Sequence, residues 1–148
     1  LLKKQDAIQT NFKLRSTFAP GTIGGSKIAR RAFIDNIIGS DYTFCYRGAA
    51  NYSLRFYETL CLGRIPLFVD TDCKLPFDDT IDWKGICLWV NQSDIDKIDE
   101  VIIDFHLKLT NSQFKERQVY CREIWEKYLS KQGFINNLNL LIKEKFIN

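Results

Sequence analysis

Residues 42–69 constrain the fold most, because they read as strand, polar loop, short helix and strand in direct succession. The apolar runs 42–46 and 65–69 each predict a strand, and residues 54–62 between them predict a helix. Gly63 follows that helix at the position where a left-handed residue commonly ends one. Two strands joined by a helical crossover are the repeating unit of a parallel sheet. We therefore expect a parallel sheet built around this stretch.

The loop between this first strand and its helix carries residues that are suited to binding an anion. Arg47 and Gly48 end the strand, Ser53 is a good N-cap, and Arg55 lies in the first turn of the helix. Guanidinium groups form charge-assisted hydrogen bonds to phosphate oxygens, and glycine lets a ligand approach the backbone closely. A helix N-terminus also attracts anions. The turn thus predicts a phosphate-binding site.

Ordinary ion pairs are the alternative to this phosphate site, with partners in Asp41, Glu58 or the acidic loop 70–84. Glu58 lies about one turn into the helix beside Arg55, where it could bind a ribose or simply pair with Arg55. The string Asp70-Thr71-Asp72 looks like a DxD metal motif. A divalent cation needs more oxygen ligands than this string offers, so we expect no metal.

Helices and apolar strands alternate along the rest of the chain. Strands are expected over residues 8–17 and 86–90. A helix is expected over 26–38, capped by Ser26 and ended by Gly39, and another over 94–109, capped by Ser93. Two further helices are expected over 112–129 and 134–146. Residues 1–6 look like the tail of a helix, and 18–25 like a loop. This alternation indicates an α/β, Rossmann-like parallel sheet flanked by helices. Ligands of such sheets bind at the carboxyl ends of the strands, where residues 47–53 stand.

The composition of the chain argues against several classes of protein. The 148 residues suit a single domain, and no apolar run approaches the roughly 20 residues of a membrane span. A net charge of +3 does not argue for nucleic acid, although residues 1–65 carry ten basic against four acidic side chains. The chain contains no Met, so we interpret it as a piece of a longer protein.

The cysteines and glycosylation sequons bear on the compartment. The five cysteines show no close pairing, which favours a reducing compartment over a disulfide framework or a zinc site. A glycan on the sequon at Asn51 would sit on the expected phosphate site. Both observations favour a cytoplasmic protein, with the Golgi lumen as the alternative.

Two other residue types are expected to be structural. His106 is the only histidine, and no neighbouring Ser, Cys or Asp spacing suggests a nucleophile pair. Trp83 is most simply a core aromatic, although in its loop it could stack on a sugar or a base. No catalytic residue is assigned.

Several short segments, taken in order and spacing, resemble the exostosin family of glycosyltransferases. They are Phe44-Cys45, Arg47-Gly48, SLRFYETL at 53–60, GRIPL at 63–67, LPF at 75–77 and Asp82-Trp83. The sequence departs from the family at Tyr46, where proline is common, and at Arg64, where a small residue is common.

The resemblance implies a GT-B glycosyltransferase of which residues 1–148 form the C-terminal, nucleotide-sugar-binding half. It implies that Arg47, Gly48, Ser53 and Arg55 contact the diphosphate of the donor, and that Glu58 contacts the ribose. Transfer to a glycan or other acceptor would proceed with inversion, with the acceptor and the general base supplied largely by the N-terminal half of the same protein. A metal cofactor is not expected, because GT-B enzymes usually offset the charge of the diphosphate with a helix dipole and basic side chains.

Three alternative functions stay open at this point. The first is a catalytically silent module that binds a nucleotide sugar or a glycan. The second is a fucosyltransferase-like GT-B enzyme, which also has a Glu-bearing helix after a Tyr-rich loop. The third is an α/β phosphate binder that is not a glycosyltransferase.

Overall fold

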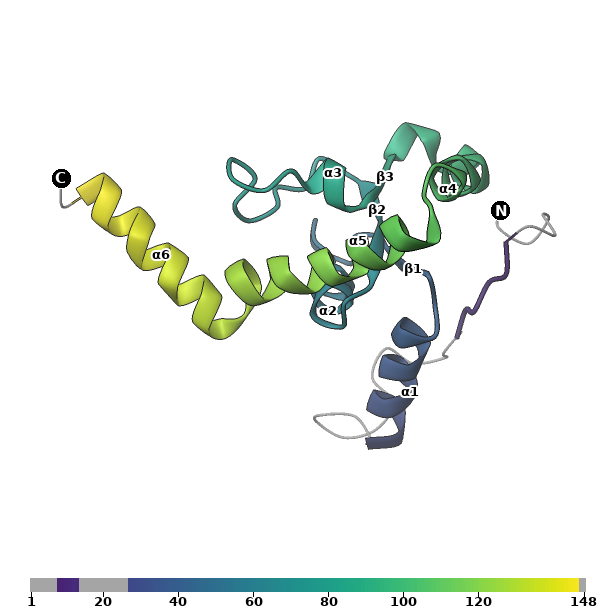
Figure 1. Ribbon diagram of the computed structural model, residues 1–148, viewed down its shortest axis with the longest axis horizontal. Helices are drawn as coiled ribbons and strands as arrows, with labels where there is room; N and C mark the ends of the chain where they lie inside the picture. The colour runs from purple at the N-terminus through teal and green to yellow at the C-terminus, as the bar shows by residue number, and fades with distance from the viewer. Residues whose placement is uncertain (1–7, 14–26, 147–148) are drawn as a thin grey trace.

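A parallel three-stranded sheet forms the centre of the protein in the computed structural model, which describes residues 8–13 and 27–146 (Figure 1). The sheet has the order β1-β2-β3, and residues Tyr42 and Leu88 pair with Ile65 and Leu67 of the central strand. Along the chain the elements are β1 (Tyr42–Cys45), α2 (Leu54–Cys61), β2 (Ile65–Asp70), α3 (Trp83–Ile86) and β3 (Leu88–Asn91). The expected α/β fold with a parallel sheet and flanking helices is confirmed.

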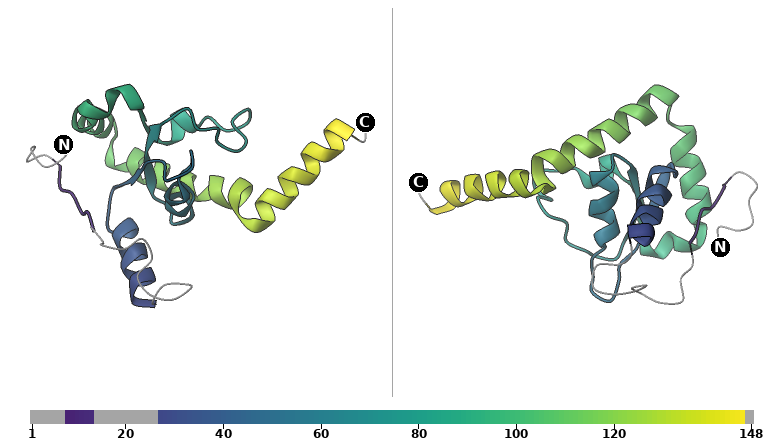
Figure 2. Two further views of the ribbon diagram at one scale, coloured as in Figure 1. Left: turned by 180° about the vertical axis from the view of Figure 1, so that it is seen from behind. Right: turned by 90° about the horizontal axis from the view of Figure 1, so that it is seen from below.

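The remaining helices surround this sheet or extend from it. They are α1 (Lys27–Ile38), the 3-10 helix η1 (Gln92–Lys97), α4 (Ile98–Leu107), α5 (Asn111–Ile124), the π-helical turn η2 (Trp125–Leu129) and α6 (Lys131–Phe146). Figure 2 shows α5 crossing the body of the domain and α6 projecting away from it. The helices α6 and α1 each bury one residue, Gly133 and Ile37 respectively, so the sheet with the helices from α2 to α5 forms the compact part of the fold.

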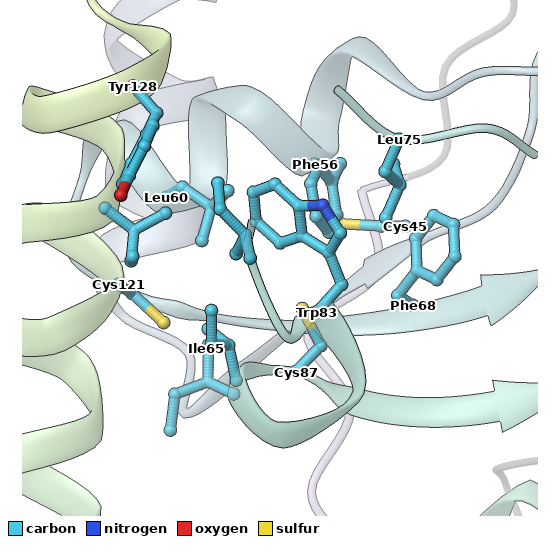
Figure 3. Packing of buried hydrophobic residues seen from close by; sticks show 13 residues of the cluster. Cys45, Phe56, Leu60, Ile65, Phe68, Leu75, Trp83, Cys87, Cys121 and Tyr128 are labelled. Carbon is cyan, nitrogen blue, oxygen red and sulfur yellow. The ribbon is translucent and has the colours of Figure 1, made fainter. Parts of the chain in front are cut away.

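Both faces of the sheet are covered, which explains why the strands are almost continuously apolar. On one face, Phe68 packs with Phe56 of α2 and Trp83 of α3 in a cluster that also takes in Cys121 of α5 (Figure 3). On the other face, the buried residues of β2 and β3 pack against Ile98 and Ile102 of α4. The indole Nε1 of Trp83 donates to the carbonyl oxygen of Pro76 at 3.1 Å, and only 4% of the residue is exposed. Trp83 is therefore a core residue.

The ends of α2 follow the sequence prediction in position. Gly63 has a φ of +61°, and its N–H donates to Leu60 while the N–H of Arg64 donates to Thr59. This pattern is a Schellman motif, which requires a left-handed residue after the helix. At the other end, Ser53 occupies the N-cap position, but its side chain makes no capping hydrogen bond. Ser53 thus occupies the predicted N-cap position but does not make the hydrogen bond expected of an N-cap.

Three other sequence predictions need correction. Residues 8–13 form no strand, and the rest of the expected strand, like residues 1–6, 18–25 and the cap Ser26, lies outside the described residues. Ile86 ends α3 instead of starting β3, because Asp82 accepts a hydrogen bond from the N–H of Gly85 and starts a short helix. Ser93 caps no helix; it bonds to Asp94 inside η1, since short polar side chains compete for local hydrogen bonds.

The cysteine environments lead to a prediction about labelling. Burial raises the pKa of the Cys45 and Cys121 thiols to about 12, and it raises the pKa of Cys87 well above its usual value. Because the thiolate is the reactive form, a raised pKa lowers its fraction at pH 7. We expect N-ethylmaleimide to reach the half-buried Cys61 and Cys73 of the native protein first, with Cys61 ahead because burial and Asp70 also raise the pKa of Cys73. Mass spectrometry of peptides would locate the label, and the other three thiols should react only after denaturant is added. Fast native labelling of Cys45 would contradict this packing.

Candidate functional site

The loop between β1 and α2 presents Arg47 and Gly48 at the carboxyl end of β1. The N–H of Gly48 donates to the carbonyl oxygen of Tyr52 at 3.1 Å, which folds the loop back toward α2. A Cβ atom added at Gly48 would meet no atom within 4 Å. The packing of the protein therefore does not itself require glycine here, and space is left beside the backbone for a ligand.

A pair of reciprocal hydrogen bonds fixes this loop to the loop after β2. The side-chain amide of Asn51 donates to the carbonyl oxygen of Thr71 at 3.0 Å, and the hydroxyl of Thr71 donates to Asn51 Oδ1 at 2.6 Å. We call the two loops joined in this way the Asn51–Thr71 bridge. It places residues that follow two adjacent strands on one surface.

Arg47 and Arg55 differ from the other arginines of the described ranges. Both are exposed, and within those ranges neither guanidinium has a hydrogen-bond acceptor or an ion-pair partner. The arginines that do have such partners bond to carboxylates or backbone carbonyls; they are Arg30, Arg31, Arg64, Arg117 and Arg122. The expected alternative, in which Arg47 and Arg55 pair with nearby carboxylates, is therefore not observed, and both remain available to an external anion.

The first turn of α2 adds backbone donors to these two arginines. Among the described residues, the N–H groups of Leu54 and Arg55 have no acceptor, and the turn contains no acidic residue. Ser53 is only 9% exposed as a residue, and its side chain makes no capping hydrogen bond to this turn. The turn thus offers amide hydrogens and positive charge to an anion.

Glu58 forms an ion pair with a residue of α1. Its Oε1 atom accepts from Nη1 of Arg30 at 3.0 Å, and the side chains are 33% and 60% exposed respectively. The guanidinium carbons of Arg30 and Arg55 each lie 5.6 Å from the ring centroid of Phe33. The structure therefore joins Glu58 and Arg55 through α1, whereas no contact within the described ranges links Arg55 to Arg47.

A separate cavity of about 450 Å³ opens between the carboxyl end of β2, the loop that follows it and α3. Its charged lining consists of Asp70, Asp72, Asp78 and Asp82 with Lys74 and Lys84, and Arg47, Ser53 and Arg55 do not line it. The excess of carboxylates would repel a diphosphate. This cavity is therefore less suited to an anion than the start of α2 is.

The DxD string forms a local turn. Asp70 Oδ1 accepts from the N–H of Asp72 at 3.0 Å, and Asp72 has a φ of 57°. Within residues 8–13 and 27–146, no group of three or more His, Cys, Asp or Glu side chains is arranged to hold a metal ion.

His106 packs against the sheet. Its Nδ1 atom lies 2.9 Å from the hydroxyl oxygen of Tyr42. Burial and the neighbouring Asp41 raise the pKa of Tyr42 to about 12, so this hydroxyl stays protonated and can donate to the ring nitrogen. The contact ties α4 to β1, which is a structural role.

Sequence reasoning missed Arg30 and Phe33 as parts of the site. Arg30 and Arg31 are adjacent in sequence, and only the docking of α1 on α2 distinguishes the first, which bonds to Glu58, from the second, which bonds to Asp35 in its own helix. A weak signal existed in the helical spacing of Arg30 and Phe33, three positions apart.

Together, the parallel sheet and its flanking helices define a Rossmann-like α/β domain with two exposed arginines, Arg47 after its first strand and Arg55 in the first turn of α2. The sequence model described as the Exostosin GT47 domain matches residues 5–104, well over half of the chain. The chain belongs to this exostosin family.

Named relatives agree with this family. An exostosin-1 homolog of Caenorhabditis elegans is 33% identical over 108 residues, which cover 72% of this chain and 27% of that protein. A probable glucuronosyltransferase of Oryza sativa subsp. japonica is 31% identical over 70 residues, 47% of this chain and 17% of that protein. A probable glucuronoxylan glucuronosyltransferase of Arabidopsis thaliana is 30% identical over 83 residues, 56% of this chain and 18% of that protein.

This chain thus spans at most about a quarter of the length of these relatives. Comparison with solved structures found no significant match. None of the helices in residues 27–146 has the length and apolarity needed to cross a bilayer.

Proposed function

We propose that this chain is the donor-binding domain of a glycosyltransferase and holds the diphosphate of a nucleotide sugar at the N-terminus of α2. The observation that carries the proposal is that the exposed guanidinium groups of Arg47 and Arg55 have no hydrogen-bond acceptor or ion-pair partner among the described residues. Within the same residues, the first two amides of α2 also lack an acceptor, and its first turn holds no carboxylate. Fork-shaped donors and a helix dipole together suit a diphosphate better than a single carboxylate. The names of the glucuronosyltransferase relatives support the class of reaction.

The same groups would act in sugar transfer. As the bond from the sugar to the diphosphate breaks, negative charge grows on the leaving nucleoside diphosphate. Arg47, Arg55 and the amides of α2 would stabilise this charge more in the transition state than in the donor complex. Glu58 would accept hydrogen bonds from the ribose, and Gly48 would leave room for the phosphates. The acceptor and the general base for inverting transfer would come from the N-terminal half of the same protein.

Titration of the protein with uridine diphosphate, guanosine diphosphate and pyrophosphate by calorimetry tests the proposal. We expect at least one nucleoside diphosphate to bind, and pyrophosphate to bind more weakly, because it lacks the contact with Glu58. Failure of all three to bind at millimolar concentration would overturn the proposed function.

Glu58→Gln should separate the ribose from the phosphates. We expect about 1.5 kcal/mol weaker binding of the nucleoside diphosphate, the low end for a hydrogen bond to a charged group, because the glutamine amide oxygen still accepts. The affinity for pyrophosphate should not fall. Glu123→Gln is the matched control, since Glu123 is exposed on α5. Equal losses for both ligands would argue against a ribose contact.

A further inference from the structure

The contact between α1 and α2 uses one of the two oxygen atoms of the Glu58 carboxylate. Arg30 Nη1 bonds to Oε1, while Oε2 has no hydrogen-bond partner among the described residues. A carboxylate can accept hydrogen bonds at both oxygens. The pair therefore holds the side chain in one orientation and leaves one oxygen for another donor.

The aromatic ring of Phe33 lies beside the cation of this pair. Arg30 and Phe33 are three positions apart on α1, and the guanidinium carbon lies 5.6 Å from the ring centroid. Arg55 lies at the same 5.6 Å distance from this ring. One ring thus contacts both the guanidinium that bonds to Glu58 and the guanidinium proposed to bind phosphate.

The negative charge of Glu58 lies close to the proposed diphosphate site, so a cation that pairs with Glu58 would favour binding there. Glu58 follows Arg55 by three residues on α2, so an unpaired carboxylate there would oppose the binding of a diphosphate at the start of the same helix. Arg30 offsets that charge. Lacking Arg30, the Glu58 side chain would also sample several rotamers, and the apparent affinity would fall by the fraction of time spent in the binding rotamer.

We infer that Arg30 is a positioning residue of the nucleotide site: it aligns Glu58 for the ribose and neutralises its charge, which makes α1 part of that site. This inference rests on the proposed function. The inference extends the nucleotide site beyond the turn between β1 and α2, because it gives α1 the role of positioning Glu58.

The test compares Arg30→Gln with Arg31→Gln. The control residue Arg31 is also exposed on α1, but among the described residues it pairs only with Asp35 of its own helix, at 2.9 Å. In calorimetric titrations with uridine diphosphate and guanosine diphosphate, Arg30→Gln should weaken binding of the nucleotide that the wild type binds by about fivefold. Arg31→Gln should change it by less than twofold, and Arg30→Lys should recover part of the loss.

A double-mutant cycle separates positioning from general damage to the fold. If Arg30 acts through Glu58, Arg30→Gln should weaken binding by less than twofold when Glu58→Gln is already present. Thermal unfolding of each variant checks that the protein is folded. The inference alone is overturned if the wild type binds the nucleotide and Glu58→Gln weakens this binding, but Arg30→Gln leaves it unchanged. It is also overturned if Arg30→Gln weakens binding equally in both backgrounds. Absence of nucleotide binding by the wild type overturns the proposed function, and the inference with it.

Discussion

Replacing Phe56 by alanine should lower the free energy of unfolding by about 3–5 kcal/mol, the range for removing a buried aromatic side chain. Phe56 has no exposed surface, and its ring centroid lies 5.1 Å from that of Phe68 on β2 and 5.3 Å from that of Trp83 on α3. These contacts hold α2 on the sheet. A cavity at this position would remove packing from three elements at once.

Urea unfolding followed by circular dichroism measures this loss, with Leu54→Ala as the matched control. Leu54 belongs to the same helix but is 66% exposed, so its removal should cost less than about 0.5 kcal/mol. Domains of this size have a total stability of roughly 5–15 kcal/mol, and the Phe56 variant would therefore be marginal at 37 °C. Similar losses for both variants would show that α2 does not depend on its buried face.

Arg55→Ala should weaken nucleoside diphosphate binding by about 1.5–3 kcal/mol, or roughly 10- to 150-fold, the range for a lost hydrogen bond to a charged group. The physical reason is that the Arg55 guanidinium is exposed and has no acceptor of its own among the described residues. Removing it frees no buried partner, so the loss reports contact with the ligand.

Calorimetry with the nucleotide and with pyrophosphate measures this effect. Both affinities should fall, in contrast to Glu58→Gln, because Arg55 is proposed to contact phosphate and not ribose. Arg31→Ala serves as the control, since it removes another exposed charge, one that pairs within α1. Arg55→Lys keeps the charge and loses the fork, so it should bind with intermediate affinity. An affinity unchanged by Arg55→Ala would remove Arg55 from the site.

Much of the fold could be predicted because its signals are local. The apolar runs that became β1 and β2, and the glycine that ends α2, each specify their structure within a few residues. The four-residue α3 was not predicted, because a single turn has no helical periodicity to detect. The start of α5 was placed one residue late; Thr110 and Gln113 form a capping box there.

The candidate site was predictable only in part, because its partners come together through packing. Arg47, Gly48 and Arg55 were proposed from one turn, and the structure leaves them exposed around that turn. The sequence did not indicate that Glu58 bonds to Arg30, 28 positions away. That ion pair depends on how α1 docks, and docking depends on tertiary contacts that no local pattern encodes. The same limit explains why Ser53, a good cap by sequence, is covered and makes no capping bond.

The Asn51–Thr71 bridge has a consequence for how a ligand would be recognised. Two hydrogen bonds between loops contribute about 1–3 kcal/mol in total, so neither loop opens without disturbing the other. A surface held in this way is already shaped before its ligand arrives, and little ordering entropy remains to be lost on binding. Association should then be a simple one-step encounter whose observed rate rises linearly with ligand concentration, without the plateau produced by a slow closing motion.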